Sequence, residues 1–143
     1  MNIEGIINVS GKSGLYKIVS QGKNSVIVES LTDGKRMPVY SHTSANSLEE
    51  IGIYTYEDTI PLVDVFTNIA KKEDCKVCIS HKSSKTELEN YFREIIEDYD
   101  EDRVYISDIK KVFQWYNSLH SFGLVKLTKK EEKKNIKTKK EDE

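Results

Sequence analysis

The chain has little of what secreted and membrane-bound proteins need. It contains only two cysteines, which is too few for a disulfide framework. No stretch approaches the roughly 20 consecutive apolar residues that cross a bilayer. The N-terminal stretch MNIEGIINVSG carries Glu4 early and lacks the basic start and apolar run of a signal peptide. We therefore expect a cytoplasmic protein with reduced thiols and no membrane partner.

A large excess of one charge is also missing. The 143 residues include 22 Lys or Arg and 24 Asp or Glu, which gives a formal net charge of -2. Proteins that hold DNA mainly through phosphate contacts are usually far more basic. A nucleic-acid role would therefore have to depend on a local basic patch.

An acidic stretch, YDEDRVYIS with Asp98 before it, spaces its carboxylates as a calcium-binding loop does. Arg103 stands where such a loop needs glycine, and Ile109 stands where it needs a bidentate glutamate. Because two defining positions fail, we interpret the stretch as a connector between helices. Ser107 is then expected to cap the following helix, since its hydroxyl can accept backbone N–H groups.

The pair Cys75 and Cys78, with His81 three residues on, has the spacing of half a zinc site. A closed zinc site needs four ligands, and a redox CxxC needs a helix start after a strand, which the surrounding pattern does not predict. The alternative role for each cysteine is that of a small core residue. The sequence also has no GxSxG elbow and no complete phosphate-binding loop, so it predicts no enzyme, no metal and no cofactor.

The first part of the chain carries the pattern of short antiparallel strands. Runs rich in β-branched residues end at turn signals, of which Gly22-Lys23-Asn24 and Asp33-Gly34 are the clearest, and the second predicts a type I′ hairpin. Pro38 favours an edge position for its strand. The expected strands are 3–9, 15–19, 25–31 and 36–40, with a short fifth at 51–56. Because no crossover helix separates them, we predict a small antiparallel SH3-like β-barrel.

Helical periodicity follows. A helix over 61–72 has Thr59 as its expected N-cap and an apolar stripe that should pack on the sheet. Ser84-Lys-Thr-Glu87 matches a capping box, and the last helix should end at Gly123. The two later helices with their short connector predict a helical hairpin. The overall expectation is therefore an α+β fold with a disordered charged tail.

These patterns predict four segments along the chain. The expected order is a β-barrel-like domain with its closing helix, a linker, a helical hairpin module and a disordered Lys/Glu-rich tail. Their expected boundaries are 1–72, 73–83, 84–126 and 127–143.

Basic and aromatic residues at the barrel turns and on the last helix form the candidate binding surfaces. Lysines beside an aromatic ring suit a peptide, or a base that stacks on the ring. A tryptophan at the boundary between the polar and apolar sides of a helix is typical of interfaces. An ordinary solvated surface is the alternative interpretation of each patch. The candidate binding residues are Lys12, Tyr16, Lys35, Arg36, Lys110, Lys111, Gln114 and Trp115.

Two stretches, GIINVSGKSGLYKIVSQGKNSVIVESLTDGKRMPVY and YDEDRVYISDIKKVFQWYNSL, resemble the two halves of a small family of uncharacterised Bacteroidota proteins. The family is catalogued as a domain of unknown function, and the likeness spans most of residues 1–125. The resemblance implies the architecture and a cytoplasmic setting. It brings no activity, cofactor or catalytic residue to this chain.

Strong structural patterning without a coherent active-site arrangement favours a non-catalytic binding or adaptor protein. It would act through contacts with a protein partner or through self-association. The alternative is a nucleic-acid-associated protein that uses the barrel-turn lysines and the Lys110/Lys111 helix face. A third hypothesis, an enzyme or metal protein centred on Cys75, Cys78 and His81, requires bound zinc.

Overall fold

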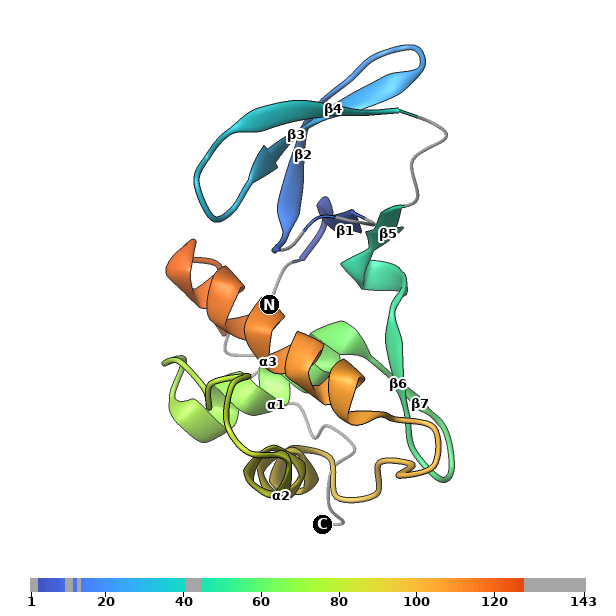
Figure 1. The fold of residues 1–143 in the computed structure, drawn as a ribbon, viewed down its shortest axis with the longest axis vertical. Helices are drawn as coiled ribbons and strands as arrows, with labels where there is room; N and C mark the ends of the chain where they lie inside the picture. The colour runs from blue at the N-terminus through green and yellow to red at the C-terminus, as the bar shows by residue number, and fades with distance from the viewer. Residues whose placement is uncertain (1–2, 10–11, 13, 41–44, 128–143) are drawn as a thin grey trace.

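The computed structural model describes residues 3–9, 12, 14–40 and 45–127. A five-stranded antiparallel sheet lies at one end of the molecule, and three helices with a second, two-stranded sheet lie at the other (Figure 1). The strands of the larger sheet are β1 (Ile6–Val9), β2 (Tyr16–Gln21), β3 (Ser25–Ser30), β4 (Arg36–Tyr40) and β5 (Ala45–Ser47). The α+β class predicted from the sequence is therefore confirmed.

The larger sheet is open. Its strand order is β4-β3-β2-β1-β5, so β1 to β4 form a meander and β5 returns to pair with β1. The four longer strands match the predicted runs, and β4, which contains Pro38, lies at an edge as expected. The short strand β5 was not predicted. Within the described residues no pairing joins β4 to β5, so the closed SH3-like barrel is not confirmed.

Both predicted hairpin turns are present, but one has a different geometry. The N–H of Gly22 donates to the carbonyl of Ser25 at 2.8 Å and closes the β2–β3 turn. In the β3–β4 hairpin only Gly34 has a positive φ, of 75°, so the predicted type I′ turn is wrong. The loop spans residues 31–35, and Asp33 instead accepts the N–H of Lys35 through its carboxylate at 3.0 Å. A loop of this length needs only one left-handed residue.

A 3-10 turn, η1 (Leu48–Glu50), leads into the two-stranded sheet of β6 (Gly52–Tyr54) and β7 (Thr59–Pro61). The strand predicted at 51–56 therefore exists, but its partner is β7 and not the larger sheet. Thr59 pairs with Tyr54 inside this sheet, so Thr59 is not the N-cap of the following helix. That position belongs to Pro61, and α1 spans Leu62–Glu73.

The remaining helices are α2 (Lys85–Ile95) and α3 (Ile106–Ser121). The capping box of α2 is confirmed, because Ser84 accepts the N–H of Glu87 at 3.2 Å and Glu87 accepts that of Ser84 at 3.1 Å. The predicted Ser107 cap of α3 is wrong. Asp108 accepts the N–H of Tyr105 at 3.0 Å instead, since the helix begins at Ile106, before the serine.

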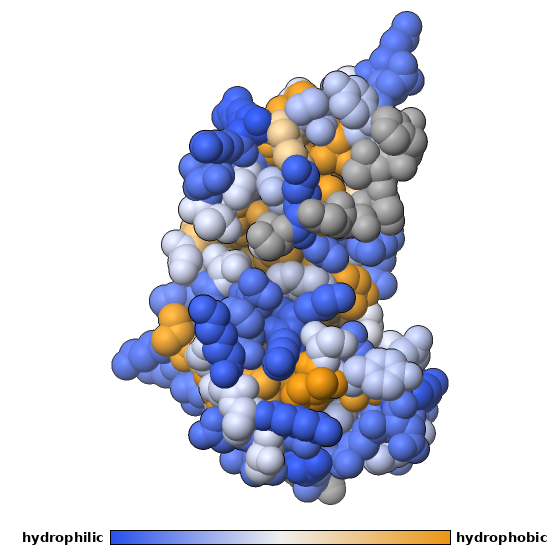
Figure 2. Space-filling view, viewed as in Figure 1, coloured by the Kyte–Doolittle hydropathy of each residue, from blue (hydrophilic) through white to orange (hydrophobic). Residues whose placement is uncertain are grey.

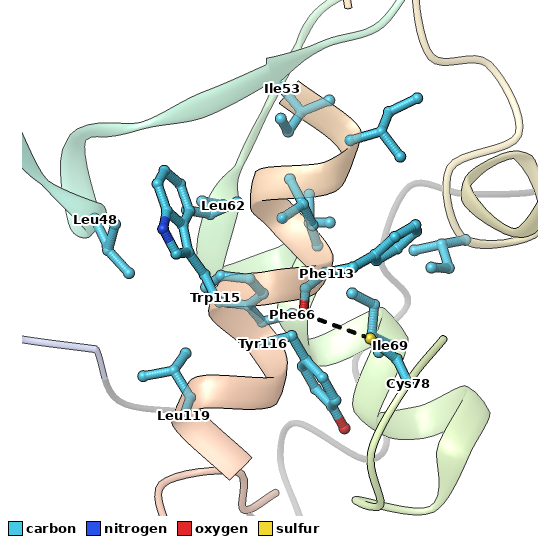
Figure 3. Packing of buried hydrophobic residues seen from close by; sticks show 14 of the residues in the cluster. Leu48, Ile53, Leu62, Phe66, Ile69, Cys78, Phe113, Trp115, Tyr116 and Leu119 are labelled. Carbon is cyan, nitrogen blue, oxygen red and sulfur yellow. Dashed lines mark hydrogen bonds between the residues drawn. The ribbon is translucent and has the colours of Figure 1, made fainter. Parts of the chain in front are cut away.

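One hydrophobic cluster joins the larger sheet to the helices. Ile6 on β1 contributes to it, together with Leu15 just before β2 and Leu31 just after β3, and the predicted stripes of α1 and α3 are buried in it (Figure 3). α1 packs against η1, β7 and α2, so its stripe does not cover the larger sheet as predicted. α2 and α3 are neighbours, but α1 shares their core, and a separate helical hairpin is not confirmed.

The larger sheet also has a small cluster of its own, made by Ile7, Val9, Val28 and Val39. Figure 2 shows hydrophobic side chains over the sheet and another group over the helices, each bordered by hydrophilic ones. The segment boundaries at 72, 83 and 126 remain predictions. The predicted tail, 127–143, lies outside the described residues apart from Leu127.

Candidate functional site

A cleft of about 270 Å³ lies where the larger sheet meets β6 and α3. Its walls come from strands, a connector and helices that are far apart in the sequence. The lining residues are Asn8, Asn46, Ile51, Gly52, Ile53, Tyr54, Leu62, Arg103, Val104, Asp108, Lys111, Val112 and Trp115.

The apolar part of the cleft centres on Trp115. Its indole ring lies beside Leu62, with Leu48 and Ile53 nearby (Figure 3). The residue is only 8% exposed and belongs to the main hydrophobic cluster, so it is more buried than its predicted position, between the polar and apolar sides of the helix, implies. The cleft therefore has a preformed apolar surface.

Arg103 forms a cationic wall whose position is fixed from two sides. Its Nε donates to Asp100 Oδ2 at 2.7 Å, and its guanidinium lies 4.3 Å from the centre of the Tyr54 ring. Chiefly this hydrogen bond, helped by the N–H of Asp102, holds the pKa of Asp100 below its ordinary value, so the carboxylate stays charged. A further contact, from Nη2 to the carbonyl of Thr55 at 3.5 Å, is long.

Lys111 and Asp108 occupy one turn of α3 in the cleft wall. The carboxylate of Asp108 is used locally, because it accepts the N–H of Tyr105 at the start of the helix. Lys111 is exposed, and its ammonium has no ion-pair partner among the residues that the structure describes. The wall thus offers an unpaired positive charge.

Two asparagines supply the opposite wall. Asn8 on β1 and Asn46 on β5 are directly opposed in the antiparallel register. Opposed residues in a sheet project to the same face, with Cβ atoms about 4.5–5.5 Å apart. The two carboxamides therefore stand side by side at the cleft.

The structure brings two of the predicted binding residues, Lys111 and Trp115, into this cleft. Lys110 is exposed on the same helix without lining it, and Gln114 is partly buried outside it. The four barrel residues lie on the larger sheet or its turns, away from the cleft lining: Lys12, Tyr16, Lys35 and Arg36. Their roles remain predictions.

Sequence reasoning missed five polar or aromatic residues of the cleft: Asn8, Asn46, Tyr54, Arg103 and Asp108. Arg103 lies in the acidic stretch that the sequence predicts to be a connector, and there it pairs locally with Asp100. The contribution of the asparagines depends on the pairing of β1 with β5, for which no local signal exists.

The two cysteines do not form a joint site. Cys78 is buried, and its Sγ lies 3.8 Å from the carbonyl of Phe113 (Figure 3). Burial is the main cause that raises the pKa of this thiol to about 12. Cys75 is a partly exposed free thiol. Within the described part of the chain, no group of three or more His, Cys, Asp or Glu side chains is arranged to hold a metal ion.

Comparisons with known proteins divide the chain at the cleft. Residues 3–48 match the family described as Domain of unknown function (DUF5606), and residues 51–119 match Domain of unknown function (DUF6852). A solution NMR structure of a protein from Bacteroides vulgatus is 42% identical and covers 87% of this chain and 90% of its own, with a TM-score of 0.71. The chain belongs to this two-part family of uncharacterised Bacteroidota proteins. No curated protein matches it.

The cleft is therefore built by both parts of the family. Asn8 and Asn46 come from the first matched region, and the lining residues from Ile51 onward come from the second. None of the helices in the described ranges is long and apolar enough to span a membrane.

Proposed function

We propose that this protein is a non-catalytic binding module, an adaptor that engages a protein partner through the cleft between its two parts. The observation that carries the proposal is the grouping of Trp115, Tyr54 and Arg103 at one junction. Tryptophan, tyrosine and arginine dominate the residues that supply binding energy in protein interfaces. Here all three are anchored by neighbours before any partner binds.

Two groups with shifted pKa values, Asp100 and Cys78, are not suited to acid–base catalysis. General acids and bases work best with pKa values near the working pH. The pKa of Asp100 beside the cleft is lowered and that of Cys78 is raised to about 12, so neither group is suited to proton transfer near neutrality. The two free thiols, Cys75 and Cys78, fit a protein that acts in a reducing compartment such as the cytoplasm.

We also propose that the larger sheet is an opened relative of an SH3-like barrel. Its four-stranded meander curves around a cluster of its own, and β5 returns to β1 across the sheet. Barrels of this size often bind partners through loops at their rim, and β5 places Asn46 at the cleft.

A nucleic-acid-associated role is the second candidate, and one observation favours it. A shallow hollow of about 320 Å³ on the β2–β3 hairpin is lined by Lys23, Asn24 and Tyr40. Tyr40 is 49% exposed, so a base could stack on it while lysines contact phosphates. Such binding would use the barrel-turn lysines and the Lys110/Lys111 face, and it would weaken steeply with salt.

Affinity capture from native cells at two salt concentrations separates the two functions. We expect a protein partner that remains bound to the wild-type chain at the higher salt concentration. Lys111→Glu should lose this partner, and Lys110→Glu should keep it, because Lys110 is the adjacent lysine that does not line the cleft. Recovery of nucleic acid alone, lost at higher salt, would favour the second function. Capture of nothing, with turnover in an activity screen, would contradict both.

A further inference from the structure

The polar groups of the cleft define what kind of partner segment it fits. Arg103 uses Nε on Asp100, and its Nη2 makes only the long contact to Thr55, so most of its guanidinium N–H groups have no partner within the described residues. Lys111, on the α3 wall, has no ion-pair partner among the described residues. The only acid of the lining, Asp108, is occupied by the N–H of Tyr105. The cleft wall therefore carries two cations, Arg103 and Lys111, with N–H groups still available to an incoming anion.

The geometry of Arg103 favours a carboxylate in that place. A guanidinium presents planar, paired N–H groups that match a carboxylate, and such charge-assisted bonds are among the strongest in proteins. Asp100 and the Tyr54 ring hold the group in position, so little side-chain freedom is lost on binding. Lys111 adds a second positive charge, and its flexible side chain can reach an anion from several directions.

The asparagine pair favours a peptide as the carrier of that carboxylate. A carboxamide has both a donor and an acceptor, which is the combination that a peptide group also offers. Neither Asn8 nor Asn46 has a side-chain hydrogen bond within the described part of the chain. An extended backbone offers an N–H donor and a carbonyl acceptor in each peptide group, so it can match both functions of each carboxamide.

Trp115 completes the arrangement. Its ring, with Val112 and Ile53, offers an apolar surface next to the cationic wall. An apolar side chain near an acidic one would therefore bury itself while the carboxylate bonds Arg103. We propose that the cleft binds an extended segment of a partner protein in which an acidic residue lies close to an apolar residue. This inference rests on the proposed function and specifies its ligand.

The test uses the full chain and randomised short peptides with blocked ends. Peptides selected on the immobilised protein are then titrated in solution, with the fluorescence of Trp115, the single tryptophan, as the readout. We expect the selected peptides to combine an acidic with an apolar residue. Replacing the acid by its amide should weaken binding by about tenfold or more, the range of one lost charge-assisted bond.

Protein variants make the site assignment specific. Lys111→Glu should weaken the binding of the selected peptides about tenfold or more. Asn46→Ala should weaken the binding of every selected peptide, whatever its side chains, because the carboxamide is expected to contact the peptide backbone. Lys110→Glu is the matched control and should change binding by less than about threefold, the effect of a distant exposed charge. Equal effects of Lys110→Glu and Lys111→Glu would overturn the proposal.

Two further outcomes also decide against it. Selection of peptides without acidic residues would overturn the assigned chemistry, and a response of Trp115 to inorganic phosphate but not to peptides would replace the peptide with a phosphate ligand. A captured protein partner that tolerates Lys111→Glu would overturn this inference and leave a binding function at another surface. The absence of any captured protein would overturn the proposed function itself.

Discussion

Asp74 and Cys75, at the end of α1, have positive φ angles of 56° and 63°. Side chains in this conformation crowd the backbone, and glycine avoids the crowding. We predict that Asp74→Gly raises the free energy of unfolding by about 0.5–1 kcal/mol, measured by urea denaturation. The same change at Lys110, an exposed site inside α3, is the control and should lower it by about 1 kcal/mol. A loss of stability in Asp74→Gly would contradict the strain assigned to this turn.

The thiol of Cys78 gives a test at alkaline pH. Burial is the chief cause that raises its pKa from 9.0 to about 12 in the folded chain. The folded state therefore favours the neutral thiol, and this stabilisation is complete below pH 9.0 and lost as the pH rises toward 12. We predict that the free energy of unfolding falls more steeply across this range in the wild-type chain than in Cys78→Ala. Parallel curves in pH-dependent denaturation would show that the thiol is not buried as described.

At the scale of single elements, the residue that caps the start of α3 differs from the one predicted from the sequence. Asp108 accepts the N–H of Tyr105, whereas Ser107 makes no such bond in the described part of the chain. Asp108→Ala should therefore cost about 1 kcal/mol of unfolding free energy, and Ser107→Ala less than about 0.5 kcal/mol, in chemical denaturation. A larger loss of unfolding free energy in Ser107→Ala than in Asp108→Ala would show that the serine caps the helix after all.

Helix stripes and strand runs could be predicted because their signals are local. Leu62 and Phe66 on α1, like Val112 and Tyr116 on α3, repeat at helical spacing, and all four are buried. The capping box at Ser84 is equally local. In contrast, β5 has the residues Ala45-Asn-Ser47, which carry no strand propensity, and the strand exists through pairing with β1. The cleft could not be predicted for the same reason, because its two asparagines come together only through that pairing.

At the scale of the whole molecule, the two family regions share one core. Ile6, from the larger sheet, is 1% exposed and belongs to the same cluster as Trp115 on α3. We predict that Ile6→Ala lowers the unfolding free energy by about 2–5 kcal/mol, the usual cost of a core cavity. Trp115 fluorescence and the NMR signals of β3 should report the same shifted transition. Loss of the β3 signals before any change in Trp115 would mean that the two parts unfold separately.

The most direct test of the central claim is an NMR titration of the full chain with its captured protein partner. The single tryptophan gives one indole N–H resonance, so the cleft has its own reporter. We predict that the resonances of Trp115, Lys111 and Asn46 change on binding, while those of Lys35 and Arg36 on the β3–β4 hairpin stay in place. Changes confined to Lys35 and Arg36, with the Trp115 resonance unmoved, would contradict a binding site in the cleft.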